Sequence, residues 1–320
     1  MSNMEIWVKR LLPAALLNSI RPTTNMIRSQ IRAIKRSMMK SLNVEDLASD
    51  LASIGIDKGD TLMVHSAMSS IGSVEDGAEP IIKSFLSRVD SDGTIMMPCY
   101  NAAEDVELGM REGRFVDLRT LKSNMGKITE VFRTWPGVAR SSHPFSSVCV
   151  LGERTDHIIS GHVKSPNICH AESPMAHIVE NNVKIVGIGV SIAVGMAVSH
   201  YIEDTDNSFP IEVHSLPFMV EYIDQSGKTV KREVVRYDPA VSANRIGSKN
   251  TEWINEKMTQ HFTRLGIMRW FQYGQAKSWV MEAEPVYQEL LKLAKKGITI
   301  YLTEQKWKSM NAGDGSIESW

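Results

Sequence analysis

The sequence predicts an α/β fold with a parallel or mixed sheet covered by helices. Two observations predict it: short apolar runs typical of strands alternate with helical patterns between residues 43 and 98, and turn-forming residues separate them. A chain of 320 residues can form one large domain or two small ones. Hydrophobic residues make up 42 % and charged residues 23 %, so the composition is that of an ordinary globular protein.

The first elements alternate between helix and strand. Asn43 is a suitable N-cap, and Glu45 and Asp46 follow in the first turn, where the helix dipole favours acidic side chains. Pro98 ends the second strand because it has no N–H to donate. We expect a helix at 44–54, a strand at 61–65, a small-residue loop at 66–72, a helix at 77–88 and a strand at 94–97.

The later elements follow the same alternation. A helix beginning near Val194 is expected to carry His200 and Glu203, and a turn at 224–227 joins the two strands of a hairpin. We expect strands at 147–151 and 183–190, hairpin strands at 218–223 and 229–237, a helical segment over 251–293 and a last strand at 298–302.

Residues 1–40 differ from the rest, with eight basic residues and one acidic residue. Between Met26 and Met39 the apolar positions recur at a helical period, which predicts a basic amphipathic helical extension. Such a helix either docks on its own domain or makes a peripheral contact with an anionic membrane surface. We therefore expect this extension, an α/β domain at 41–310 and a polar, frayed tail at 311–320.

Charge and cysteine usage restrict the partners and the compartment. A formal net charge of −1 gives no reason to expect nucleic acid as a partner. No apolar run is long enough to span a membrane, and Pro13 interrupts the N-terminal one, so no signal peptide is expected. Cys99, Cys149 and Cys169 lack CxxC spacing and are odd in number, which indicates a reducing, cytoplasmic location.

Small hydroxyl residues follow the strand at 61–65, in the loop from Ser66 to Gly72. Such a loop exposes backbone N–H groups that can bind phosphate oxygens, although an ordinary turn has the same composition. Neither a Walker lysine nor a GxGxxG pattern is present, which disfavours nucleotide kinases and dinucleotide-dependent dehydrogenases.

The segment 133–147 is a second candidate binding region. It holds Arg133, Arg140, His143 and several hydroxyl residues among turn formers. The planar guanidinium of arginine suits phosphate, and loops often carry binding residues. The alternative is a structural corner built from proline and glycine.

His200 and Glu203 form the third candidate. Positions i and i+3 share a helix face, so the carboxylate can reach an imidazole nitrogen. A carboxylate there fixes the tautomer and stabilises the imidazolium, which suits a general base in acyl transfer to an amine. The alternative is a half-buried histidine paired with its helix neighbour.

Other chemistries remain open from the residues alone. Cys99 follows a strand end and is a conceivable nucleophile with His200 and Glu203, in a hydrolase or an acyl-enzyme transferase. A non-catalytic ligand-binding protein is a further alternative. We expect no metal site, because four histidines lack paired ligand spacing: His157, His162, His170 and His177.

Taken in order, six segments resemble the aminoglycoside 3-N-acetyltransferase family, which comprises antibiotic acetyltransferases unrelated to the GNAT fold. The most specific is PGVARSSHP at Pro136–Pro144. The six lie at 64–72, 92–98, 117–126, 130–144, 172–174 and 200–203, within residues 45–205.

The resemblance implies a single α/β domain around a central mixed sheet, and direct transfer from acetyl-CoA without an acyl-enzyme. His200 is similar to the family's general base and Glu203 to the acid beside it. Backbone N–H groups in the Ser66–Gly72 loop would stabilise the oxyanion. The coenzyme A wall would comprise His65, Ser66, Ser69, Ser70, Gly72, Arg140, Ser141 and His143.

Aminoglycosides are polycations, so the resemblance also implies an acidic acceptor pocket. We expect the amine acceptor to contact Tyr100, Glu104 and Asp117. The stretch Val194–Ser199 before the histidine is more apolar than the family pattern. We therefore prefer an amino sugar of surface polysaccharide synthesis to an antibiotic as the acceptor, and we leave monomer and homodimer open. Further acids for the pocket are Asp105, Glu107, Glu203, Asp204 and Asp206.

Overall fold

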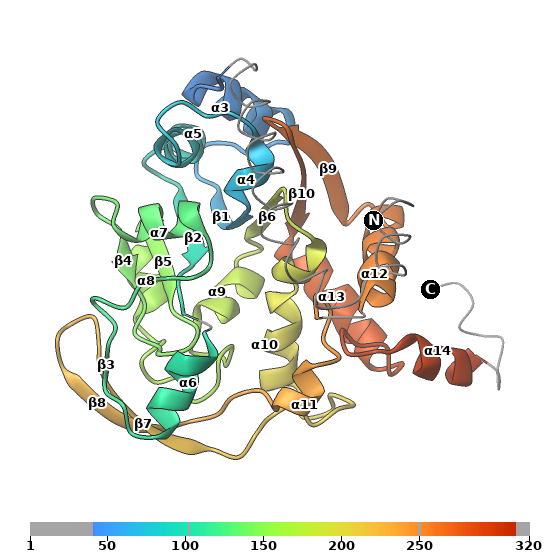
Figure 1. Cartoon of the computed structure of the whole chain (residues 1–320). Coiled ribbons are helices and arrows are strands. Elements are labelled where there is room, and N and C mark those ends of the chain that lie inside the picture. The colour runs from blue at the N-terminus through green and yellow to red at the C-terminus, as the bar shows by residue number, and fades with distance from the viewer. Residues whose placement is uncertain (1–40, 102, 249–250, 312–320) are drawn as a thin grey trace, which may run out of the picture.

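Figure 1 shows a central sheet with helices on both faces and a smaller sheet at one end of the molecule. This computed structural model describes residues 41–101, 103–248 and 251–311. The predicted α/β fold, a single domain around a central mixed sheet, is confirmed. The predicted helical extension at 1–40 and the tail beyond Asn311 lie outside the described residues.

The central sheet has seven strands in the order β4-β5-β2-β1-β6-β10-β9. β1 lies parallel to both β2 and β6, and every other pair is antiparallel. The three parallel strands therefore form the centre of the sheet. Their bounds and those of the outer strands are β1 Thr61–Ser66, β2 Thr94–Pro98, β6 Lys184–Ile188, β4 Ala139–Arg140, β5 Val148–Gly152, β9 Met268–Tyr273 and β10 Ala276–Glu282.

Alternate residues of β1 point to opposite faces of the sheet. Leu62 and Val64 pack against α3 (Val44–Ser53), α5 (Glu79–Val89) and α7 (Lys127–Arg133). Met63 points to the other face, as does His65 two residues further on. That face is covered by α9 (Pro174–Glu180), α10 (Ala197–Thr205), α12 (Glu252–Arg264) and α13 (Ala283–Ala294).

Local sequence explains how the first helix begins. The side chain of Asn43 accepts from the N–H of Asp46 at 2.8 Å, and the Asn43 N–H donates back to the Asp46 carboxylate at 3.4 Å. This capping box confirms the predicted N-cap.

Among the described residues, no helix is long and apolar enough to cross a bilayer. The remaining helices are short: α4 Met68–Ile71, α6 Glu104–Arg111, α8 Thr155–Ile159, η1 Ile192–Gly195, α11 Pro239–Ser242 and α14 Glu304–Asn311.

A second sheet has the order β3-β7-β8, with β3 at Val116–Asp117. The predicted hairpin is confirmed as β7 (Phe218–Ile223) and β8 (Thr229–Val234), although β8 ends three residues earlier than expected. Met110 and Leu118 join the core between this hairpin and its neighbours.

The C-terminal part corrects two predictions. The segment 251–293 is not continuously helical, because β9 and β10 form a hairpin between α12 and α13. Gly266 and Gly274 adopt φ of 70° and 55°, which ends the helix and turns the hairpin. The expected strand at 298–302 is also wrong: this buried stretch forms turns, and its Ile300 carbonyl accepts from the Ile246 N–H at 2.8 Å.

Candidate active site

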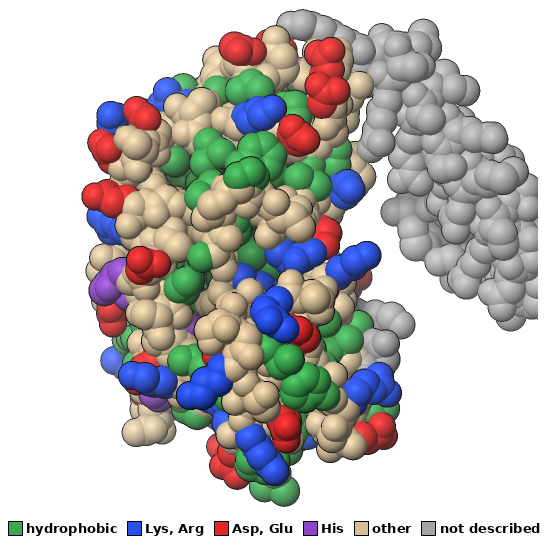
Figure 2. Space-filling model, turned by 90° about the vertical axis from the view of Figure 1, so that its left-hand side faces the viewer, with side chains coloured by type: hydrophobic (Ala, Val, Ile, Leu, Met, Phe, Trp, Pro, Cys, Tyr) green, Lys and Arg blue, Asp and Glu red, His purple; other side chains and the backbone are tan. Residues whose placement is uncertain are grey.

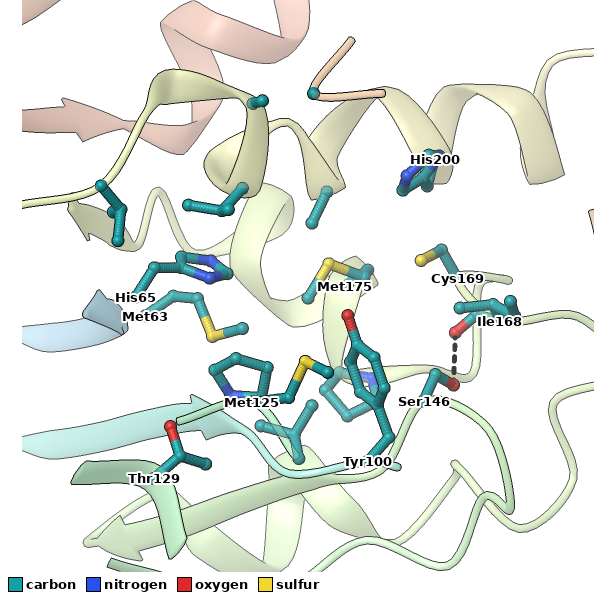
Figure 3. Close-up of a pocket in the computed structure, with 18 of the residues that line it drawn as sticks. Met63, His65, Tyr100, Met125, Thr129, Ser146, Ile168, Cys169, Met175 and His200 are labelled. Carbon is teal, nitrogen blue, oxygen red and sulfur yellow. Dashed lines mark hydrogen bonds between the residues drawn. The ribbon is translucent and has the colours of Figure 1, made fainter. Parts of the chain in front are cut away.

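A cavity of about 410 Å³ lies at the carboxyl ends of β1 and β2 (Figure 3). His65 and Ser66 line it from the end of β1, and Tyr100 lines it just after β2. On the opposite side, α10 contributes His200. The carboxyl ends of parallel strands are where α/β sheets commonly bind ligands. This cavity is therefore the candidate active site.

A carboxylate holds the imidazole of His200. The Nδ1 atom lies 2.6 Å from Oε2 of Glu203, so the contact expected from the i and i+3 spacing is present. The His200 side chain is 15 % exposed and that of Glu203 is 0 % exposed. With Nδ1 engaged, Nε2 remains for a ligand in the cavity, toward which Figure 3 shows the ring.

Two further donors hold the Glu203 carboxylate. The Ser199 hydroxyl donates to Oε1 at 2.9 Å and the Tyr301 hydroxyl donates to Oε2 at 3.0 Å. Burial alone would raise the pKa of the Glu203 carboxyl, but its contacts with His200, Ser199 and Tyr301 bring the pKa below its ordinary value. The carboxylate therefore stays charged and can orient the imidazole.

Asp204, the next residue, anchors a second histidine. Its Oδ1 lies 2.7 Å from Nε2 of His214, and its Oδ2 accepts from the Cys169 N–H at 2.7 Å. The hydrogen bond and charge of Asp204 raise the pKa of His214. The ring of Tyr237 lies 4.8 Å from that of His200 and 5.7 Å from that of His214, between centroids. These contacts fix α10 beside the cavity.

His65 lies on the other side of the cavity and is only 9 % exposed. Its Nε2 has no hydrogen-bond partner within the described residues. Burial lowers the pKa of His65 to about 4, so the ring is neutral near pH 7. A neutral imidazole can donate or accept a hydrogen bond but brings no charge to the cavity.

The rest of the lining is largely apolar. Met63, Met125 and Met175 extend into the cavity in Figure 3. None of the described residues that line it is Asp or Glu, and Arg245 is the one Lys or Arg among them. The acidic pocket implied by the resemblance is therefore not present in this lining.

Comparison with known proteins shows to which family the chain belongs. A family model described as aminoglycoside 3-N-acetyltransferase matches residues 63–295. The chain belongs to the aminoglycoside 3-N-acetyltransferase family. Aminoglycoside N(3)-acetyltransferase IX of Micromonospora chalcea is 27 % identical over 256 residues, covering 74 % of this chain and 88 % of that protein. The predicted family is confirmed, and with it the assignment to N-acetyltransferase enzymes.

Solved structures of the family share the fold. The structure described as AAC-IIIb binary with CoASH matches with a TM-score of 0.69 at 22 % identity, covering 81 % of this chain and 98 % of that chain. The aminoglycoside acetyltransferase AAC(3)-Xa matches with a TM-score of 0.70 at 21 % identity, covering 86 % and 99 %. At these identities the likeness establishes the fold.

In this family member, only part of the predicted donor wall lines the cavity. His65 and Ser66 do so. The predicted loop at 66–72 contains the short helix α4, on which Ser69 and Ser70 lie. Gly72 directly follows α4 and has a φ of 104°. These three residues are not in the cavity lining, and their role in donor binding stays a prediction.

Part of the backbone in this loop is already hydrogen-bonded. The Ala67 N–H donates to the Ile188 carbonyl at 2.9 Å, and the Ser70 N–H donates to the Ala67 carbonyl at 3.0 Å. The Ser70 hydroxyl donates to the Gly189 carbonyl at 3.2 Å. The N–H groups of Ala67 and Ser70 are therefore engaged, and stabilisation of an oxyanion by the other N–H groups of this loop stays a prediction.

Arg140, Ser141 and His143 are buried and outside the cavity lining. Arg140 Nη1 donates to two backbone carbonyls in the segment 118–121, at 2.9 and 2.7 Å. Ser141 Oγ lies 2.8 Å from Nδ1 of His162, whose ring stacks on His143 with centroids 4.9 Å apart. These contacts fit the structural corner that was the alternative for this segment, and the donor-binding role stays a prediction.

Of the two predicted acceptor-binding residues whose side chains the structure describes, one lines the cavity. Tyr100 lines the cavity. Asp117, on β3, lies outside the lining, and its Oδ2 accepts from Arg119 Nη2 at 2.7 Å. Glu104 begins α6, and its side chain lies outside what the structure describes. Acceptor binding by these residues stays a prediction.

Cys99 packs on the opposite face of the sheet from His200. It belongs to the buried cluster of Met97 beneath α5, whereas Pro98 and Tyr100, which alternate with it, line the cavity. The Cys99 side chain is fully buried. Cys99 therefore cannot attack a carbonyl bound beside His200.

Sequence reasoning missed several residues of the site. Ser199 lies four positions before Glu203 on the same helix, so the helical period offered a signal for it. Tyr301, Tyr237 and Arg245 come from distant segments and carry no local signal. Only the folded chain brings them together.

The four histidines considered for a metal are not gathered at one point. The rings of His157 and His177 are 4.3 Å apart between centroids, whereas His162 stacks on His143. Across the described ranges, no group of three or more His, Cys, Asp or Glu side chains is arranged to hold a metal ion.

Proposed function

We propose that the chain transfers an acyl group, acetyl in the first instance, from coenzyme A to the amine of an amino sugar, with His200 as the general base. The observation that carries this proposal is the 2.6 Å contact between His200 Nδ1 and Glu203 at the edge of the cavity. Membership of the aminoglycoside 3-N-acetyltransferase family supports the reaction class.

The chemistry requires a base because an ammonium has no lone pair. With its Nδ1 proton donated to Glu203, His200 takes a proton from the acceptor ammonium at Nε2, and the free amine then attacks the thioester carbonyl. The C–S bond then breaks, the imidazolium gives its proton to the thiolate of coenzyme A, and the nitrogen releases its second proton to solvent as the amide forms. Such a base contributes about 10²- to 10⁴-fold in rate.

The donor proposal is supported by the AAC-IIIb structure with CoASH, which shares the fold. We place the thioester near His65 and Ser66, the two predicted donor residues that line the cavity. Transfer is direct in this proposal. Cys169 also lines the cavity, but burial, reinforced by Asp204 and Glu203, raises the pKa of its thiol well above the ordinary value. A thiol held in its neutral form is a poor nucleophile.

The acceptor is proposed as a small-molecule amine on a sugar. AAC-VIa has been solved bound to sisomicin, which supports an amine-bearing glycoside as the general class. A cytoplasmic location, a membrane contact through residues 1–40 and the choice between monomer and homodimer stay predictions from the sequence.

A thiol-release assay with acetyl-CoA and a panel of amino sugars and aminoglycosides tests the proposal. We expect coenzyme A release with at least one amine, acylated product by mass spectrometry, and an unmodified intact protein mass during turnover. No release with any amine, together with no binding of coenzyme A by calorimetry, would remove the proposal. A transient acyl mass on the protein would replace direct transfer by an acyl-enzyme.

A further inference from the structure

A positively charged residue lines the cavity beside His200. Aminoglycosides, the acceptors in the family name, are polycations and would favour negative charges there. The positively charged residue is Arg245, and no described lining residue is Asp or Glu. We propose that the acceptor bears an anionic group, a carboxylate or a phosphate, close to its reactive amine, and that Arg245 binds this group. This inference rests on the proposed acyl transfer and names the substrate class of the same site.

Arg245 has a fixed backbone and an uncommitted side chain. Its N–H donates to the Ser242 carbonyl at 3.1 Å, its carbonyl accepts from the Ser248 N–H at 2.9 Å, and the next residue, Ile246, is tied to Ile300. Within the described residues, no carboxylate forms an ion pair with its guanidinium, and no hydrogen bond from that group is present. A positioned guanidinium with free N–H groups suits bidentate binding of carboxylate or phosphate.

The acids nearest to the site are already engaged. Both oxygens of Glu203 accept hydrogen bonds, from Ser199 at one and from His200 and Tyr301 at the other. Asp204 is occupied in the same way, as described above. An ammonium group of an acceptor would therefore find no free carboxylate here.

Two of the other acids expected for the acceptor pocket, Glu107 and Asp117, are also paired. Glu107 accepts from Arg111 and Arg236. Asp117 pairs with Arg119, as described above. On the face of the molecule in Figure 2, Lys and Arg side chains gather in the lower half, and acidic side chains are scattered among them. A polycation would meet repulsion at Arg245, and no described residue of the cavity lining is an acid that would compensate it.

Arg245 lines the same cavity as His200, and its charge acts on residues near the His200–Glu203 pair. Burial raises the pKa of the Tyr301 hydroxyl, and the positive charge of Arg245 is near enough to oppose that rise. Burial also raises the pKa of the Tyr100 hydroxyl, and the charge of Arg245 opposes that rise as well. Tyr301 bonds directly to the carboxylate that holds His200. The phosphates of coenzyme A are removed from its thiol by the whole pantetheine arm, so the acceptor is the better source of the anion.

Matched acceptors test the inference. In thiol-release assays with acetyl-CoA, we would compare methyl glucosaminide with glucosamine 1-phosphate for the phosphate arm, muramic acid for the carboxylate arm, and kanamycin as a polycation. We expect kcat/KM of the wild type to be at least about tenfold higher for an anionic acceptor than for methyl glucosaminide, as for one charged hydrogen-bond pair.

Variants of Arg245 identify the residue responsible. Arg245→Ala is expected to bring the ratio of anionic to uncharged kcat/KM close to one, and Arg245→Lys, which keeps the charge, to retain part of it. Arg269→Ala is the matched control, since Arg269 lies on β9 outside the cavity lining, and should keep the wild-type ratio.

Three results would overturn the inference. They are a wild-type ratio near one, best activity with kanamycin, or a ratio that survives in Arg245→Ala while KM for acetyl-CoA rises, which would assign Arg245 to the donor. These failures leave acyl transfer itself intact. Absence of thiol release with every acceptor would overturn the proposed function as well, so the two failures are distinguishable.

Discussion

Two of the three histidines in the described lining of the cavity, His65 and His200, differ in what surrounds them. His200, on α10, is bonded at Nδ1 to a carboxylate, which Ser199 and Tyr301 hold in turn. His65, at the end of β1, is buried and has no partner at Nε2 within the described part of the chain. Residue type alone does not distinguish them, whereas their neighbours do.

The difference assigns separate roles. A carboxylate beside His200 stabilises the imidazolium formed when the ring takes a proton, as a general base requires. Burial without such a partner lowers the pKa of His65 to about 4, so His65 stays neutral and can only form a hydrogen bond to a ligand. The predictions below test this contrast, in order of expected effect.

Replacing the partnered histidine should have the largest effect. His200→Ala removes the base and is expected to lower kcat by about 10²- to 10⁴-fold. Affinity for coenzyme A, measured by calorimetry, should remain near that of the wild type. His157→Ala, on α8 outside the cavity lining, is the control. If His200→Ala retains most of the activity, the base is another residue.

Replacing the carboxylate while keeping its shape should cost somewhat less. Glu203→Gln no longer stabilises the imidazolium, and we expect a loss of about 10² in kcat with a smaller change in KM. Glu180→Gln, at the exposed end of α9, is the matched control and should behave as the wild type. Equal activity of Glu203→Gln and the wild type would remove the distinction between the two histidines.

The unpartnered histidine should affect stability against pH. Its pKa is about 4 in the folded chain and about 6.5 when unfolded, so the unfolded state binds a proton that the folded state does not. The folded state is therefore not penalised by His65 above about pH 6.5, and its free energy of unfolding falls as pH drops from about 6.5 toward 4. From pH 7.5 to pH 5 the loss is about 2 kcal/mol, and His65→Gln should abolish it.

Denaturant unfolding at the two pH values measures this difference. Met63→Leu, a change of similar volume on the same strand and in the same cavity lining, is the control and should keep the wild-type dependence on pH. An unchanged acid sensitivity in His65→Gln would mean that His65 titrates normally, and the two histidines would then be electrostatically alike.

The smallest expected effect comes from one donor behind the dyad. Tyr301→Phe removes the 3.0 Å hydrogen bond to Glu203 and should cost about 1.5 kcal/mol, or about twelvefold in kcat, as for a weak hydrogen bond to a charged group. Tyr287→Phe on α13 is the control, and its kcat should match the wild type. A normal kcat in Tyr301→Phe would show that Ser199 alone suffices to hold Glu203.

The sequence predicted the parts of the site that depend on local period. The i and i+3 spacing indicated that His200 and Glu203 would meet, and the alternation of strand and helix indicated the central sheet. Tyr301 reaches Glu203 across 98 positions, which no local pattern encodes. Arg245 follows α11 (Pro239–Ser242) and likewise lines the cavity together with His200, which no local pattern encodes.

The errors have physical reasons as well. β10 is buried along most of its length, so it lacks the alternation that marks a strand with one exposed face. That made the segment between α12 and α13 resemble a continued helix, although Gly266 and Gly274 marked its turns. The buried stretch 298–302 is apolar because it packs in the core, without pairing to the sheet.

The pH dependence of the difference in rate between the wild type and His200→Ala tests the central claim most directly. If His200 removes the proton of the acceptor ammonium, this difference should be largest near neutral pH. It should narrow as pH rises and free amine no longer needs a protein base. A difference that stays constant up to pH 9.5, or a variant as active as the wild type at pH 7, would contradict the account.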